Sequence, residues 1–185
     1  MTVAMQQIYE PSATEIAVGS TMLKTVLGPY KLHCRYLQSA RVQKDNRNGS
    51  LMTAWGKFAI AESCYIADTG HFNAVEFNIC FNQLTYCLLA QSIQDQLLSA
   101  LEGWNIVEFG RRQLSDFLIV HFESTFRKPL NARGFEGRVD IARVTIRKTN
   151  IFMKISCSFE DREGGTSEGE ALIVIANGHQ EEPLA

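Results

Sequence analysis

The features that would point to a membrane or a nucleic acid are missing from this 185-residue sequence. It has no apolar run of the roughly 20 residues that a membrane-spanning helix needs. Its formal net charge is only −2, whereas nucleic-acid-binding domains usually carry an excess of basic residues. It also lacks RNP, helix-turn-helix and zinc-finger patterns. We therefore expect no membrane span and no nucleic-acid partner.

Motifs for metal, nucleotide and serine-nucleophile chemistry are absent as well. The sequence has no metal-ligand spacing, no Gly-rich nucleotide loop and no Ser nucleophile elbow, so we expect no metal site. Its five cysteines, at positions 34, 64, 80, 87 and 157, form no Cys-x-x-Cys pair. Four have strongly apolar neighbours, which indicates buried free thiols in a reducing compartment. The N-terminus lacks the layout of a signal peptide, so we expect a cytoplasmic protein.

What is present is the composition of one globular domain. Apolar residues make up 45% of the chain and charged residues 21%, as in ordinary globular proteins. A chain of this length can bury about 70% of its unfolded surface. Without internal repeats or low-complexity blocks, the sequence predicts one domain over residues 13–178. A flexible leader at 1–12 and a frayed tail at 179–185 flank it.

Residues 68–86 are the stretch around which the rest of the chain is organised. Turn chemistry at Asp68 and Gly70 precedes a nearly uncharged run. Apolar residues fall on every side of it, which predicts a helix buried all round that ends near Gln91 or continues towards Ala100. Buried amides and carboxylates are costly unless they find partners or a ligand. The polar residues that need them are Asn73, Glu76, Asn78, Asn82 and Gln83.

The remaining segments fit one known architecture. The predicted elements are a helix at 13–27, strands at 36–43 and 52–65, the long helix, an irregular connection at 103–110, and strands at 117–127, 135–148, 151–161 and 169–177. An antiparallel sheet wrapped around one long buried helix, with an N-terminal helix, is the α+β hotdog fold. The outer edge of such a sheet usually pairs with a second subunit, so we expect a homodimer or a larger homo-oligomer.

The strand at 117–127 is the clearest case of alternation. Its odd-numbered residues should lie on one face and its even-numbered ones on the other. The first set is Phe117, Ile119, His121, Glu123 and Thr125, and the second is Leu118, Val120, Phe122, Ser124 and Phe126.

Four blocks of the sequence, taken together, are similar to one family of hotdog proteins. They resemble the mycobacterial-type long-chain acyl-thioester hydrolases called FcoT-like, from the turn at Gly28 to the strand at Gly169. The segment 70–73 is also similar to a signature of hydroxybenzoyl-CoA-type thioesterases. Asp68 lies one residue too close to Gly70 for that signature, so its catalytic acid is not carried over. The four blocks are Glu62–Ile66, Thr69–Glu76, Cys80–Leu84 and Phe126–Asn131.

The resemblance implies an enzyme that acts on fatty acyl thioesters carried on acyl carrier protein or coenzyme A. Relatives in actinomycete isonitrile lipopeptide pathways add the glycine amine to C3 of a (2E)-enoyl group on acyl carrier protein. They then hydrolyse the thioester and release an N-carboxymethyl-3-amino fatty acid. A plain long-chain acyl-CoA or acyl-ACP thioesterase is the alternative, and a non-catalytic acyl-thioester binder is a third. No cofactor is implied beyond the phosphopantetheine of the carrier.

By matching blocks, the resemblance assigns the catalytic site to Tyr30, Tyr65, Asn73 and Asn82. Backbone amides near Asn73, at the positive end of the helix dipole, would stabilise the oxyanion or enolate. The bland alternatives are a helix N-cap for Asn73, a satisfied core amide for Asn82 and aromatic packing for the tyrosines.

Two titratable residues at the helix start are further catalytic candidates. His71 is the only histidine there and is a candidate base for the glycine ammonium or for water. Its alternative is an imidazole that structures the loop. Glu76 is expected to accept from the amine or to hold His71, and a first-turn acid favoured by the dipole is the alternative.

The expected substrate-binding residues lie on the helix and near the end of the strand at 117–127. Arg127 and Lys128 would meet a pantetheine phosphate, the acidic face of a carrier protein or the glycine carboxylate. Ordinary surface charge is the alternative for both. Ser124 and Gln83 are the other expected substrate-binding side chains.

Overall fold

The computed structural model describes residues 15–44, 49–66 and 70–178. The predicted leader at 1–12, the tail at 179–185 and Asp68 therefore lie outside the described residues. Seven strands form one antiparallel sheet in the order β1-β2-β3-β5-β6-β7-β4. The elements are β1 (Glu15–Ala17), α1 (Ser20–Leu27), η1 (Leu32–Cys34), β2 (Leu37–Gln43), β3 (Met52–Phe58), α2 (Ala74–Gln94), η2 (Ser99–Leu101), α3 (Ile106–Arg112), β4 (Phe117–Lys128), β5 (Phe135–Arg147), β6 (Asn150–Glu160) and β7 (Thr166–Ile175).

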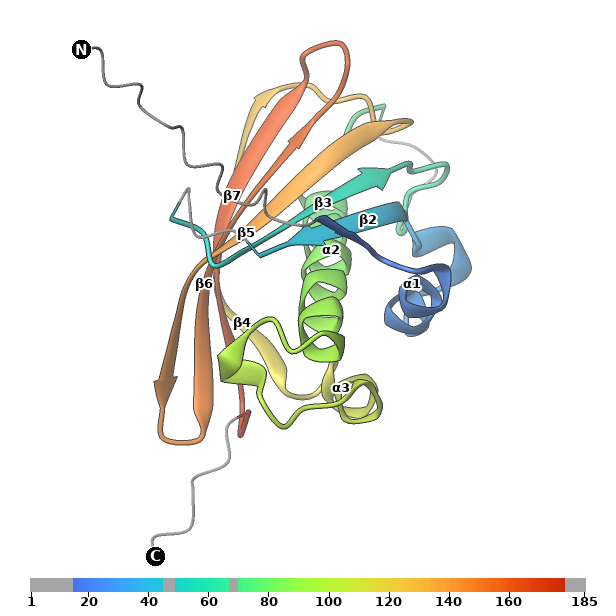
Figure 1. The fold of residues 1–185 in the computed structure, drawn as a ribbon. Helices are drawn as coiled ribbons and strands as arrows, with labels where there is room; N and C mark the ends of the chain where they lie inside the picture. Colours follow the sequence, from blue (N-terminus) through green and yellow to red (C-terminus); the bar gives the residue numbers. More distant parts are fainter. Residues whose placement is uncertain (1–14, 45–48, 67–69, 179–185) are drawn as a thin grey trace, which may run out of the picture.

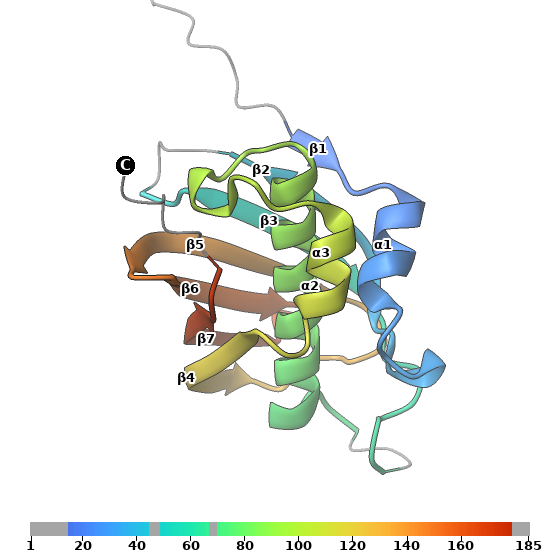
Figure 2. The ribbon, with the colours of Figure 1, turned by 90° about the horizontal axis from the view of Figure 1, so that it is seen from below.

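The sheet curls around α2, which confirms the predicted α+β hotdog fold (Figure 1). Seen from below, α1 lies on the side of α2 away from the strands, and α3 lies against the C-terminal half of α2 (Figure 2). Strict alternation along β6 places apolar side chains against the helix, and the opposite face carries polar side chains apart from Phe152. The side chains facing the helix are Ile151, Met153, Ile155, Cys157 and Phe159, all of them buried.

Aromatic rings fill the space between the first turns of α2 and the sheet. Phe77 packs edge-on against Phe122, Phe126 and Phe159 at centroid distances of 4.9–5.7 Å. The sheet must lie close to this ring, since a Cβ on Gly169 would stand 3.0 Å from Phe77. The Phe rings themselves therefore occupy the space between the first turns of α2 and the sheet.

The N-terminal segment differs from the predicted helix at 13–27. Helix α1 begins only at Ser20, after Gly19, which offers no side-chain cap. Residues 15–17 instead form the short edge strand β1, in which Ile16 pairs with Val42 of β2. Extended backbone at Ile16 suits its β-branched side chain. Met22, Val26 and Leu27 form the buried face of α1.

The sequence prediction also misses α3, which falls in the expected irregular connection at 103–110. Its N-cap is Asn105, whose side chain accepts a hydrogen bond from the Glu108 backbone amide at 3.0 Å. An Asn followed three residues later by Glu is a helix-start signature. Gly110, a poor residue for a helix interior, hid that signal. Strand β3 ends at Phe58 rather than at residue 65, and β7 begins three residues earlier than predicted.

Strand β4 lies at the open edge of the sheet and does not alternate simply. Its register against β7 shifts between Ile119 and His121 and again between Phe126 and Lys128. These bulges bring Phe117 to the same core-facing side as Phe122, although simple alternation predicts opposite faces. An extra residue in one strand reverses the side-chain phase beyond it. The prediction of two uninterrupted faces is therefore wrong.

Candidate active site

Three loops meet at the N-terminal end of α2. The Phe72 amide donates to the Leu130 carbonyl at 3.1 Å, and the Ile60 amide donates to the Ala132 carbonyl at 2.9 Å. Arg133 also donates to the Ile60 and Ala61 carbonyls. The loops at 59–66 and 70–73 are thereby tied to the loop after β4. This end of the molecule lies at the top of Figure 1.

Asn73 is the N-cap of α2. Its side-chain Oδ1 accepts hydrogen bonds from the Val75 amide at 2.9 Å and the Glu76 amide at 3.3 Å. The N-cap alternative is thus what the structure displays, and it removes two first-turn amides from the set of oxyanion donors. The expected donors near Asn73 and Ala74 remain a prediction.

Asn82 lies on the stretch of α2 that is only partly covered. Its amide nitrogen donates to Asn78 Oδ1, one helical turn earlier, at 2.6 Å, and both side chains are half-buried. Val75 on the same side is exposed. Asn82 is therefore not an enclosed core amide but part of a polar pair open to a neighbouring group.

Tyr30 packs beside the middle of α2. Burial raises the pKa of its hydroxyl, and the nearby Tyr86, Cys87 and Cys80 raise it further. The turn that holds Tyr30 is fixed by Arg35, whose Nε donates to the Tyr30 carbonyl at 3.0 Å. A hydroxyl with a raised pKa stays protonated, so Tyr30 is a hydrogen-bond donor and not a base.

Tyr65 and His71 lie on the loops that cover the start of α2. The Tyr65 side chain is 53% exposed, and His71 is also exposed. Both therefore border the site from the solvent side, on either side of residues 67–69. Their catalytic roles stay predictions.

Gln83 has a structural role in this chain instead of the predicted contact with substrate. It is fully buried, and its Oε1 accepts from the Tyr36 and Leu37 amides, each at 3.0 Å. Its Nε2 donates to the Cys34 carbonyl at 2.6 Å. Gln83 thus fastens the segment between η1 and β2 onto α2, and its polar atoms are engaged by backbone.

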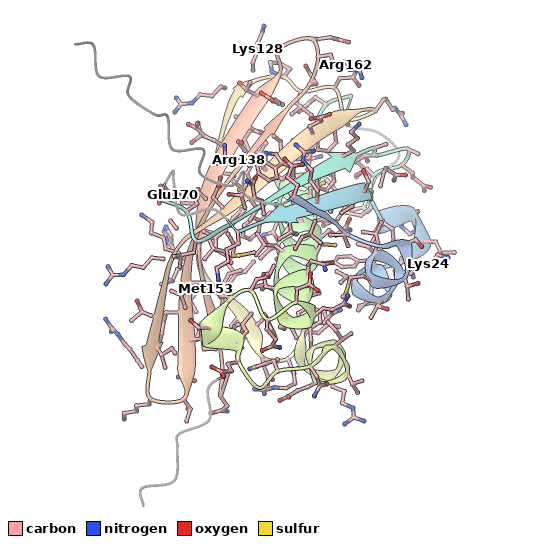
Figure 3. The ribbon with its side chains drawn as sticks, in the orientation of Figure 1. Lys24, Lys128, Arg138, Met153, Arg162 and Glu170 are labelled. Carbon is pink, nitrogen blue, oxygen red and sulfur yellow. The ribbon has the colours of Figure 1, made fainter. Side chains whose placement is uncertain are left out.

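Arg127 and Lys128 do not face α2. Arg127 donates from Nε and Nη2 to Glu168 Oε1, at 3.0 and 2.6 Å, on the outer face of the sheet. Lys128 lies beside the β6–β7 turn, near Arg162 (Figure 3), and its Nζ stands 3.3 Å from where a Cβ on Gly164 would be. Neither is placed to bind a group at the start of α2 within one chain. Ser124 lies between Phe122 and Phe126 on the strand and is half-buried.

Glu76 and Tyr36 are two deeply buried side chains that each carry a polar oxygen. Each is only 1% exposed, and neither Glu76 Oε2 nor Tyr36 Oη has a hydrogen-bond partner. Burial raises the pKa of Tyr36, and Cys64, Cys34 and Glu76 nearby raise it further. Tyr36 is a residue that the sequence did not single out. An aromatic residue at the start of a strand carries no signal that its hydroxyl will lack a partner.

The described ranges contain no cluster of His, Cys, Asp and Glu suited to hold a metal ion. Within the same ranges, no helix is long and apolar enough to cross a bilayer. All five cysteines are free, and four of them are buried, which confirms the predicted free thiols.

Comparison with known proteins places this geometry in a family. The model of the FcoT-like thioesterase domain matches residues 25–175, and the chain belongs to that family. The chain is also similar to enzymes named (2E)-enoyl-[ACP] glycyltransferase. One from Streptomyces coeruleorubidus is 42% identical over 84% of this chain and 96% of its own length. One from Mycobacterium marinum is 35% identical over 90% of this chain and 91% of its own length.

The fold alone is shared more widely. A crystal structure from Syntrophus aciditrophicus, provisionally described as a thioesterase, matches with a TM-score of 0.50 at 8% identity. The match covers 84% of this chain and 95% of that one.

Proposed function

We propose that this enzyme adds glycine to C3 of a (2E)-enoyl group carried on acyl carrier protein and then hydrolyses the thioester. The product is an N-carboxymethyl-3-amino fatty acid. The observation that carries the proposal is the 42% identity to a (2E)-enoyl-[ACP] glycyltransferase over nearly all of that protein. It is supported by the polar start of α2, where Asn73, Glu76, Asn78 and Asn82 lie.

The chemistry asks for hydrogen-bond donors at the thioester oxygen. When an amine attacks C3, negative charge develops on that oxygen as an enolate, and when water attacks the carbonyl it develops as an oxyanion. The N-terminus of α2 supplies amides and the positive end of a helix dipole. The Tyr30 hydroxyl, beside α2, and the side-chain amide of Asn82, on α2, add neutral donors. One set of donors would therefore serve both steps.

Amine addition followed by hydrolysis is redox-neutral, so the proposed reaction needs no cofactor beyond the phosphopantetheine of the carrier. The five reduced cysteines suit a reducing compartment, and we place the enzyme in the cytoplasm. An N-carboxymethyl-3-amino acid is the intermediate expected of isonitrile biosynthesis on the strength of the family resemblance.

We further propose that the enzyme is a homodimer formed along the β4 edge. This strand has an unpaired side and carries exposed apolar residues, with Val120 54% exposed. Long edge strands of this kind are usually paired or protected by charge. A second β4 would bring another subunit next to Asn78 and Asn82, and the acyl tail would run between the subunits. A monomer in sedimentation velocity at assay concentration would contradict this arrangement.

The decisive experiment incubates the purified protein with an enoyl-ACP, with and without glycine, and follows products by mass spectrometry. We expect an amine adduct of the free acid only when glycine is present. Release of free enoic acid at the same rate with and without glycine, and no adduct, would favour the plain thioesterase.

A further inference from the structure

Between residues 75 and 93, one stripe of α2 is not buried. Its members follow the i, i+3, i+4 and i+7 spacing of a single helix face, and they are Val75, Asn78, Ile79 and Asn82. The stripe ends at Asn82, because residues 83–93 are all buried. At about 100° per residue it lies on the side of the helix away from Phe77, which packs against the sheet. The two asparagines therefore belong to the face of this helix that the core does not use.

Two asparagines one turn apart are a costly choice for the interior of a helix. Each costs up to about 0.7 kcal/mol of helix propensity relative to alanine. Asn82 Nδ2 donates to Asn78 Oδ1 at 2.6 Å, but a side-chain pair of this spacing returns only about 0.2–0.5 kcal/mol to the helix. Helix stability therefore does not account for the pair.

The bond to Asn78 fixes the orientation of the Asn82 side-chain amide. The last torsion of an asparagine side chain is soft, so an amide on an open helix face turns freely unless something holds it. An amide nitrogen carries two N–H donors, and Asn78 Oδ1 accepts one of the two from Asn82. Among the described residues the Asn82 side chain forms no other hydrogen bond. Its second N–H is therefore left for another acceptor, in a direction that the bond to Asn78 sets.

We propose that Asn78 is a positioning residue that aims the free N–H of Asn82 at the thioester oxygen of the substrate. This inference rests on the proposed function, in which Asn82 is one of the neutral donors. The oxygen becomes an enolate when the amine attacks C3 and an oxyanion when water attacks the carbonyl, and the same N–H donates to both. A donor that is already aimed needs no reorientation as the charge develops, which is the source of its effect. Asn78 itself contacts Asn82 and not the reacting atoms.

A double-mutant cycle separates this role from a structural one. A residue that acts only through Asn82 has nothing left to position once the Asn82 amide is gone, so the two substitutions are not additive. A residue that merely supports the helix lowers activity by the same factor whether or not Asn82 is present. The cycle needs the wild type, Asn78→Leu, Asn82→Ala and the double variant. Leucine removes the acceptor oxygen and is a good helix former, so it does not disturb the helix backbone.

The test measures initial rates of adduct formation and of thioester hydrolysis at saturating enoyl-ACP while glycine is varied. We expect Asn78→Leu to lower kcat for adduct formation about tenfold, with KM for glycine near the wild-type value, because the lost interaction forms in the transition state. In the Asn82→Ala background the same substitution should change kcat by less than about twofold. The melting temperature of Asn78→Leu should equal or exceed that of the wild type.

Asp95→Ala is the matched control. It breaks a similar side-chain bond one turn long, in which Gln91 Nε2 donates to Asp95 Oδ2 at 2.7 Å, but Asp95 lies about 20 Å further along the helix axis than Asn82. Both kinetic constants should stay near the wild-type values.

Two results would overturn the proposal. They are an equal loss of kcat from Asn78→Leu in both backgrounds, and no loss beyond that of Asp95→Ala in the wild-type background. A wild type that hydrolyses the thioester but forms no adduct would refute the proposed function alone, and the same cycle read on hydrolysis then decides the role of Asn78. A wild type that catalyses neither reaction would refute both.

Discussion

The polar side chains in the two halves of α2 differ in their hydrogen-bond partners. In the C-terminal half, Ser92 donates to the Leu88 carbonyl at 2.7 Å, and Gln91 donates to Asp95 at 2.7 Å. Helix α3 covers this half, and Phe109 packs edge-on against Tyr86. Thr85 is the exception, with an unpartnered hydroxyl. Polar groups here are satisfied locally, one turn away along the helix.

The N-terminal half instead leaves its polar groups open or uses them to hold loops. Glu76 has a buried oxygen with no partner, while Asn78 and Asn82, both half-buried, bond to each other. Gln83 marks the boundary, because its bonds go to backbone 46–49 residues away. The comparison teaches that one helix can serve as core at one end and as a site at the other. Stability and activity should therefore respond separately to mutations in the two halves.

The largest effect is expected at the boundary. Gln83→Leu keeps the bulk of the side chain but leaves the Cys34 carbonyl and the Tyr36 and Leu37 amides without partners. At about 1–3 kcal/mol for each buried group left unsatisfied, the free energy of unfolding should fall by more than about 3 kcal/mol. Urea denaturation measures it. Gln94→Leu, at an exposed position on the same helix, is the control, and equal losses in both variants would refute the role given to Gln83.

Mutations at and around the N-terminal half of α2 should lower enzymatic activity while leaving the free energy of unfolding nearly unchanged. Asn82→Ala removes an amide that bonds only to Asn78, and Tyr65→Phe removes an exposed hydroxyl. We expect kcat/KM to fall about tenfold or more for each variant, because each loses a donor in the transition state. The free energy of unfolding should change by less than about 1 kcal/mol. Loss of the soluble fold in both variants would show that these residues serve only packing.

The smallest effect is expected in the C-terminal half. Ser92→Ala deletes a hydroxyl that bonds within the helix, and the Leu88 carbonyl keeps its helical partner. The free energy of unfolding should change by about 1 kcal/mol or less, and the kinetic constants should match the wild type. A drop in activity without a drop in stability would erase the contrast between the two halves of α2.

Much of the fold was readable in the sequence, because periodicity is a local property. The buried helix, the central strands and the two C-terminal hairpins follow from runs of alternating or helical apolar residues. The misses are equally instructive. Residues 15–17 became a strand since β2 offered an edge to pair with, and α3 formed from a capping signal that Gly110 obscured. The bulges in β4 depend on its register against β7, which no single strand encodes.

The sequence predicted where the site lies on α2, but it did not predict the hydrogen-bond partners of the site residues. The sequence determined that polar residues would sit at the start of a buried helix, and its similarity to the FcoT-like family named most of them. Only the tertiary structure decided which of them are already engaged. Asn73 caps the helix, Gln83 forms hydrogen bonds with a distant backbone segment, and Arg127 pairs with Glu168 on the outer face of the sheet. Gln83 reaches the Tyr36 amide only because folding brings together residues 47 positions apart in the chain, and hydrogen-bond satisfaction is a property of that packing and not of spacing.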